Sequence, residues 1–119
     1  MKIKTSEATP LQLNWLVATC EGMDIEIRPA GACGRPLYVL AAASGRTPWT
    51  WSPSTSWHQG GEIIEREKIA LFPQEIGTWA AGDQYTRGET PLIAAMRCYV
   101  AAKLYDEVEI PEELKCGTE

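Results

Sequence analysis

The fold is decided by Thr9–Arg28, whose sequence is TPLQLNWLVATCEGMDIEIR. Its first four residues, Thr9–Gln12, predict a helix start, because threonine can cap the backbone amides, proline suits the first helical position and glutamine completes a capping box. Gly22 supplies a left-handed stop. Apolar and charged residues then alternate over Met23–Arg28, which predicts a strand with one face on a core. A helix followed by such a strand predicts a mixed architecture.

The first helix is predicted to end near Glu21, and a last helix is predicted to run from a similar start signal, Thr90–Leu92, to Leu104. Apolar side chains every three or four positions mark the inner face of such helices. For the first helix we expect this face to carry Leu11, Trp15 and Ala18, flanked by Leu16 and Cys20.

A middle helix is predicted from Ser56, with Gln59 three residues later, to about Glu67. Its inner side is expected to hold Trp57, Ile63 and Ile64. The neighbouring residues Gly60 and Gly61 together cost about 2 kcal/mol of helical propensity. We therefore expect a packing or close-approach reason for these glycines.

Short apolar runs predict further strands. Leu37–Leu40 follows a turn at Pro29–Pro36 and forms a hairpin with the preceding strand, while Ile69–Phe72 and Thr78–Ala81 form a second hairpin. Together they predict an antiparallel sheet of about four strands. With three helices, the expected fold class is α+β, a layered sandwich in one domain over residues 1–119.

Charge and cysteine content exclude several classes of function. The net charge of −5 arises in an acidic segment from about Asp106, where six acids face Lys115, so the rest of the chain is neutral. We expect a solvated tail there, and no grip on extended nucleic acid. The start lacks an export signal and no membrane span is apparent, which favours the cytoplasm. The cysteines lie too far apart for a metal knuckle, so we expect reduced thiols in the core and no metal: Cys20, Cys33, Cys98 and Cys116.

Catalytic signals are missing. His58 is the one histidine and stands in no catalytic motif, and the glycines do not form a phosphate loop. Glu62 and Glu65 could act as acid and base, but carboxylates on a surface helix are usually solvated or paired. We therefore expect no enzyme activity and no cofactor.

Tryptophan is concentrated between Arg46 and Gly61. Trp57 is expected to be core, whereas Trp49 and Trp51 alternate and cannot both point inward if the segment is extended, so one should be exposed. An exposed indole can stack on a nucleobase, and free amides at a helix start can hold a phosphate. The predicted ligand-binding residues are Arg46, Trp49, Trp51, Ser54, Thr55, Trp57 and Gln59.

Two motifs resemble the bacteriophage NinX family: Ser52–Glu67, SPSTSWHQGGEIIERE, and Thr90–Ala101, TPLIAAMRCYVA. The order of elements is also distantly similar to phage proteins with an α-β-α sandwich domain. The family usually has an aspartate at the position of Ser56 and an alanine at that of His58. The resemblance implies a phage or prophage accessory protein in the cytoplasm of a bacterial host, with no enzymatic activity to transfer.

Some small phage proteins sequester nucleotide-derived signals of bacterial immunity. By this analogy, the expected function is non-enzymatic binding of a small nucleotide-like ligand by a homo-oligomer, most simply a dimer. The alternatives are an adaptor that presents the tryptophan loop or the acidic tail to a host protein, and an enzyme that uses Glu62 or Glu65.

Overall fold

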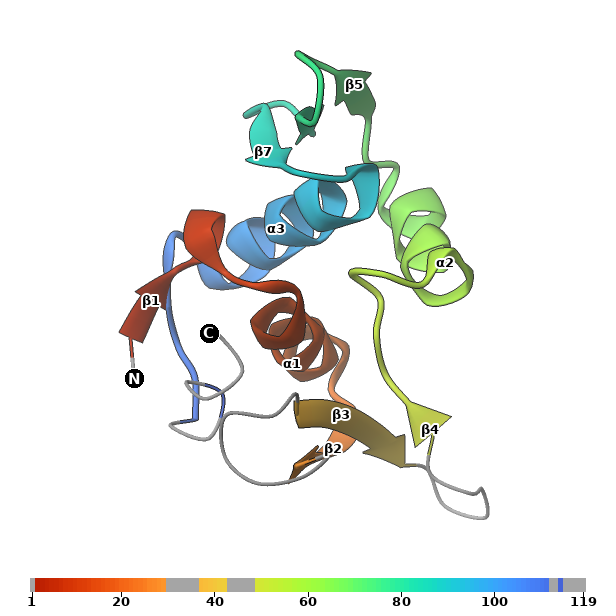
Figure 1. Ribbon diagram of the computed structural model, residues 1–119, viewed down its shortest axis with the longest axis vertical. Helices are drawn as coiled ribbons and strands as arrows, with labels where there is room; N and C mark the ends of the chain where they lie inside the picture. The colour runs from red at the N-terminus through yellow and green to blue at the C-terminus, as the bar shows by residue number, and fades with distance from the viewer. Residues whose placement is uncertain (1, 30–36, 43–48, 112–113, 115–119) are drawn as a thin grey trace.

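Three helices form the central framework of the domain (Figure 1). The computed structural model describes residues 2–29, 37–42, 49–111 and 114. The helices are α1 (Pro10–Glu21), α2 (Trp57–Glu67) and α3 (Pro91–Leu104), and a short 3₁₀ turn, η1, spans Thr5–Glu7. Their predicted positions are confirmed.

The helix starts show the predicted capping. Thr9 Oγ1 accepts a hydrogen bond from the Gln12 amide at 3.4 Å, and Gln12 Oε1 accepts one from the Thr9 amide at 3.0 Å. Ser56 and Thr90 accept from the amides three residues on, at the starts of α2 and α3. Local capping therefore positions all three helices.

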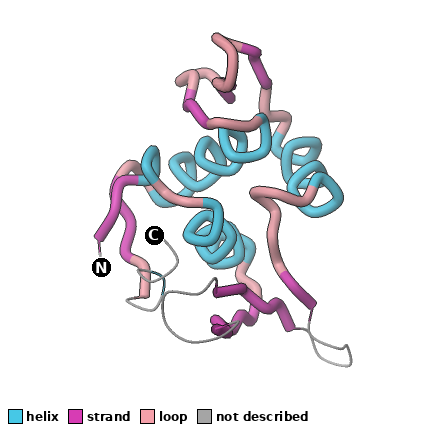
Figure 2. Tube along the Cα trace, viewed as in Figure 1, coloured by secondary structure: helices cyan, strands magenta, loops and turns pink. Residues whose placement is uncertain are grey.

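The strands form three small antiparallel groups instead of the predicted sheet of about four strands (Figure 2). One sheet contains β2 (Asp24–Pro29), β3 (Leu37–Ala42) and β4 (Trp49–Thr50). A second contains β5 (Leu71–Pro73), β6 (Trp79–Ala81) and β7 (Thr86–Gly88). Both predicted hairpins are present, but they do not join.

The helices explain this difference, because α1 and α3 lie between the two three-stranded sheets (Figure 1). Both helices carry apolar residues around most of their circumference, which is typical of buried helices. The inner face predicted for α1 was too narrow: Leu13 and Val17 are fully buried, while Leu11 and Trp15 are partly buried. A buried pair of helices thus keeps the two hairpins apart.

The two ends of the described chain pair with each other. β1 (Lys2–Lys4) runs antiparallel to β8 (Glu107–Glu109), with lysines opposite glutamates and Ile3 opposite Val108. Val108, Ile110 and Leu114 are buried in the core, although the acidic side chains of β8 remain exposed. The prediction of a solvated tail from Asp106 is therefore wrong for these apolar residues, because the alternation of acids and apolar residues turns Val108 and Ile110 toward the core and leaves the glutamates in solvent.

The predicted inner side of α2 is confirmed only in part. Ile63 is buried and Ile64 packs against the core, but the Trp57 side chain is 56% exposed, so its assignment to the core was wrong. The reason is at Gly60, where the helix approaches the Pro53 carbonyl so closely that a Cβ would lie 2.2 Å from the oxygen. This contact turns the Gly60 and Ile63 side of α2 inward and leaves Trp57 outside. Within the part of the chain that is described, no helix is both long and apolar enough to cross a membrane.

Candidate functional site

The tryptophans occupy positions different from those predicted. Trp51 is buried, and its indole nitrogen has no hydrogen-bond partner among the described residues. Trp49 is half-buried and packs against the core. The expectation that one of this pair is exposed was wrong, because β4 ends at Thr50 and strand alternation does not continue to Trp51. Trp57 is the exposed indole of the stretch.

Two of the predicted ligand-binding residues, Ser54 and Gln59, form hydrogen bonds that hold the segment before α2 in place. Ser54 is buried; its amide donates to Asn14 Oδ1 at 3.1 Å, and its hydroxyl lies 2.7 Å from the same oxygen. The Gln59 side chain accepts from the Ser52 amide at 2.6 Å and donates to the Thr50 carbonyl at 3.0 Å. These bonds fasten the segment before α2 to α1 and to β4.

A small pocket lies where α2 and α3 begin, and we call it the Trp57 corner. It has a volume of about 200 Å³ and is lined by Ser54, Thr55, Trp57, Thr90, Pro91, Leu92 and Ile93. Neither helix has an acidic residue in its first turn. Both helix starts carry a partial positive charge, although Ser56 and Thr90 cap the Gln59 and Ile93 amides and Pro91 has no N–H group.

The fold therefore brings together only some of the predicted ligand-binding residues. Ser54, Thr55 and Trp57 line the Trp57 corner. Trp51 and Gln59 serve the fold, as described above, and Arg46 lies outside the described residues. Thr90–Ile93 from α3 was not among the predicted site residues, although its Thr-Pro-Leu start signal was recognised.

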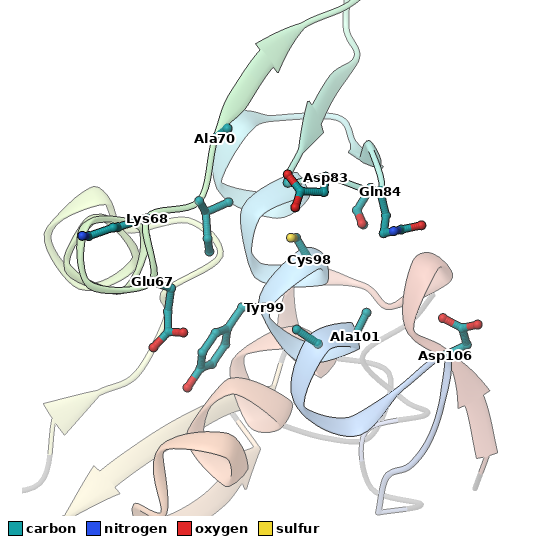
Figure 3. A pocket seen from close by; sticks show the side chains of 13 residues that line it. Glu67, Lys68, Ala70, Asp83, Gln84, Cys98, Tyr99, Ala101 and Asp106 are labelled. Atoms are coloured by element: carbon teal, nitrogen blue, oxygen red, sulfur yellow. The ribbon is translucent and has the colours of Figure 1, made fainter.

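A larger cavity, of about 610 Å³, was missed by sequence reasoning (Figure 3). We call it the acidic cavity, because Glu67, Asp83 and Asp106 enter it from three separate segments, against one cation, Lys68. The other lining residues are Ile69, Ala70, Gly82, Gln84, Thr86, Cys98, Tyr99, Ala101 and Ala102. The cavity also borders the last turns of α2 and α3, whose carbonyl ends are partially negative. Its charge therefore disfavours a phosphate.

Tyr99, which lines the acidic cavity, also belongs to a polar clamp with Glu21 and Arg66. The Arg66 guanidinium donates to both carboxylate oxygens of Glu21, at 3.0 and 2.6 Å, and the Tyr99 hydroxyl donates a short hydrogen bond to Glu21. The Arg66 hydrogen bonds hold the pKa of Glu21 below its usual range, and burial, with the Glu21 hydrogen bond second, raises the pKa of Tyr99. The clamp joins α1, α2 and α3 through side chains from all three helices.

The described cysteines lack the features of activated nucleophiles. Burial raises the pKa of the Cys20 thiol to about 11, and burial also raises that of Cys98. Cys98 reaches the wall of the acidic cavity, but its thiol is protonated at neutral pH and is a poor nucleophile. Cys33 and Cys116 lie outside the described residues.

These features define a small α+β fold in which the Trp57 corner and the acidic cavity lie at opposite ends of the pair formed by α2 and α3. Residues 4–103 match the family described as "Bacteriophage P22, NinX", and the chain belongs to this family. No curated protein shows significant similarity to the chain. Membership is consistent with a phage accessory protein.

Proposed function

We propose that the protein is a non-catalytic phage accessory protein that binds a small, planar, anionic ligand of the nucleotide class at the Trp57 corner. The observation that carries this proposal is the meeting of two helix starts beside the exposed indole of Trp57. An indole offers a stacking face for a nucleobase, and the helix starts offer partial positive charge to a phosphate.

The charge distribution supports the choice of this pocket over the larger one. The Trp57 corner has hydroxyl groups from Thr55 and Thr90 and no carboxylate among its lining residues. The acidic cavity would place a phosphate near Asp83 and other carboxylates, and the mutual repulsion would weaken binding. The acidic cavity is the larger of the two, but its negative charge makes it the less suitable pocket for an anionic ligand.

The pocket volume also bears on the oligomeric state. Typical small-molecule sites measure about 300–1,000 Å³, and the Trp57 corner, at about 200 Å³, falls below that range. A second copy of the chain against this surface would enclose more of the ligand, so we propose a homo-oligomer, most simply a dimer. Light scattering after size exclusion, with and without nucleotide, measures the mass directly.

In a phage-infected cell, a binder without catalysis would act by sequestration. We propose that the ligand is a nucleotide-type signal and that its removal counters host immune signalling. This role requires a folded protein that binds its ligand tightly without converting it. It does not require the catalytic motifs that are missing from the sequence.

Calorimetric titration with nucleoside monophosphates and cyclic nucleotides tests the ligand class. Trp57→Ala should weaken binding about tenfold or more, because loss of one stacked base contact costs about 1–3 kcal/mol. Tyr85→Ala is the matched control, since Tyr85 is a similarly exposed aromatic residue, 58% exposed, in the turn between β6 and β7. No heat with any nucleotide, or equal losses in both variants, would contradict the proposal.

Exposure of Trp57 also favours a second candidate, an adaptor that docks a host protein on the same corner. Large exposed aromatic residues are frequent anchors of protein interfaces. Affinity capture from bacterial lysate would then recover one stoichiometric host protein with the wild-type chain and lose it with Trp57→Ala. A nucleotide binder should retain no such protein, so the two functions are distinguishable.

A further inference from the structure

A buried arginine on α3 is not explained by the Trp57 corner. Arg97 is only 8% exposed. Its Nε and Nη2 atoms donate to the Ala8 carbonyl at 3.3 and 2.8 Å, and Nη1 donates to the Arg87 carbonyl at 3.0 Å. A guanidinium has five N–H donors, so two of them, one on Nη1 and one on Nη2, form no hydrogen bond to a described residue.

The positive charge of Arg97 is also weakly compensated. Its described partners are neutral carbonyl groups, apart from Glu89, whose Oε1 lies 3.8 Å from Nη1. That distance is too long for a hydrogen bond, and the Glu89 side chain is 68% exposed. Buried charges in proteins are normally neutralised by a close, hydrogen-bonded counterion. Arg97 is held in place by backbone carbonyl groups and has no hydrogen-bonded counterion among the described residues.

The arginine lines a small cavity with further groups that suit an anion. The cavity measures about 160 Å³ and is lined by Ser6, Gly77, Thr78, Arg87, Gly88, Glu89 and Arg97. The lining residues include two arginines, one glutamate and the hydroxyl-bearing residues Ser6 and Thr78. Arg87 is exposed and can move toward a ligand, whereas Arg97 is fixed.

We propose that this cavity binds an oxyanion of phosphate size, either free phosphate or the terminal phosphomonoester of a small metabolite. The two spare N–H groups of Arg97 can bind two oxygens of one tetrahedral anion, and Arg87 can neutralise the remaining charge. The cavity shares no lining residue with the Trp57 corner, so this site is separate from it and does not depend on the function proposed there.

Calorimetry with inorganic phosphate and, in a second arm, glycerol phosphate tests the site and distinguishes the two sources. Arg87→Ala should weaken phosphate binding about tenfold or more, because a charge-assisted hydrogen bond is lost. Glu89→Gln should tighten it by several-fold, since the competing carboxylate is removed. Tighter binding of glycerol phosphate than of phosphate identifies a phosphomonoester, and the reverse order identifies the free anion.

Two control variants keep the test specific. Lys103→Ala and Lys68→Ala each remove an exposed cation that does not line the cavity; both should leave phosphate affinity unchanged. Thermal unfolding checks that each variant is folded. Absence of phosphate binding in both the wild-type chain and Glu89→Gln, or equal effects of Arg87→Ala and Lys103→Ala, would overturn the proposal.

Discussion

Replacing Gly60 by alanine tests the closest packing of α2. A Cβ at this position would lie 2.2 Å from the Pro53 carbonyl oxygen and 2.7 Å from Leu92 Cδ2. Because the oxygen belongs to the main chain, it cannot rotate away as a side chain could, and a backbone segment has to shift. Gly61 is the matched control in the same helix, since its Cβ would meet only Trp57 Cε3, at an ordinary 3.9 Å.

The two substitutions should change stability in opposite directions. Alanine gains about 1 kcal/mol over glycine inside a helix at either position. Gly61→Ala should keep most of this gain and stabilise the protein by about 0.5–1 kcal/mol. At Gly60 the overlap with backbone costs about 3 kcal/mol, the upper end for overpacked cores, so Gly60→Ala should destabilise the protein by about 2 kcal/mol. The variants then differ by about 3 kcal/mol, or roughly 10 °C in Tm.

Urea unfolding followed by far-ultraviolet circular dichroism measures both changes. The slope against urea should stay the same for both variants, so that the midpoints report stability alone. A Gly60→Ala protein as stable as the wild type would refute the reasoning, because α2 could then not be held against the Pro53 carbonyl. Loss of stability in both variants would instead point to a helix that tolerates no side chain on either residue.

Three further predictions concern the polar contacts and the thiols. Asn14→Leu removes the acceptor of the buried Ser54 amide, while the Ser54 hydroxyl keeps the Pro10 carbonyl as an acceptor, so urea unfolding should show a loss of about 2 kcal/mol. The hydrogen bond from Arg66 lowers the folded-state pKa of Glu21, so the stability that Glu21 contributes is present above its unfolded-state pKa and is lost as the pH falls through its folded-state pKa. Glu21→Gln should therefore flatten the acid side of a plot of unfolding free energy against pH, between about pH 5 and 3. An unchanged acid side would contradict the clamp. Cys20, with a pKa of about 11, should react with iodoacetamide at pH 8 about a hundredfold more slowly than a free thiol, as peptide mass spectrometry can measure.

Local signals in the sequence predicted the elements well. The Thr9–Gln12 capping box and the Thr90 start signal placed α1 and α3 because these bonds join residues only three apart. Alternation and turn residues placed both hairpins for the same reason. The glycine pair in α2 correctly predicted a close approach of this helix to another segment, although the segment that contains Pro53 could be identified only from the structure.

Contacts between distant segments could not be predicted in this way. Periodicity does not indicate which strands share a sheet, and among the described residues the two hairpins belong to separate sheets. The pairing of β1 with β8 depends on complementary charge across the length of the chain. The acidic cavity was missed because Asp83, Tyr99 and Asp106 carry no local motif and meet only after α3 packs. Trp57 was misplaced because its helical position suits either side until Gly60 fixes the rotation of α2.

The pairing of Lys2–Lys4 with Glu107–Glu109 has a consequence for synthesis on the ribosome. It closes a loop of about a hundred residues, the slowest kind of contact to form. Until β8 emerges, the core positions filled by Val108, Ile110 and Leu114 stay empty and the apolar surface beneath them faces solvent. Nascent chains stalled before β8 should therefore be recognised by chaperones and proteases, whereas chains that have released this segment should escape them.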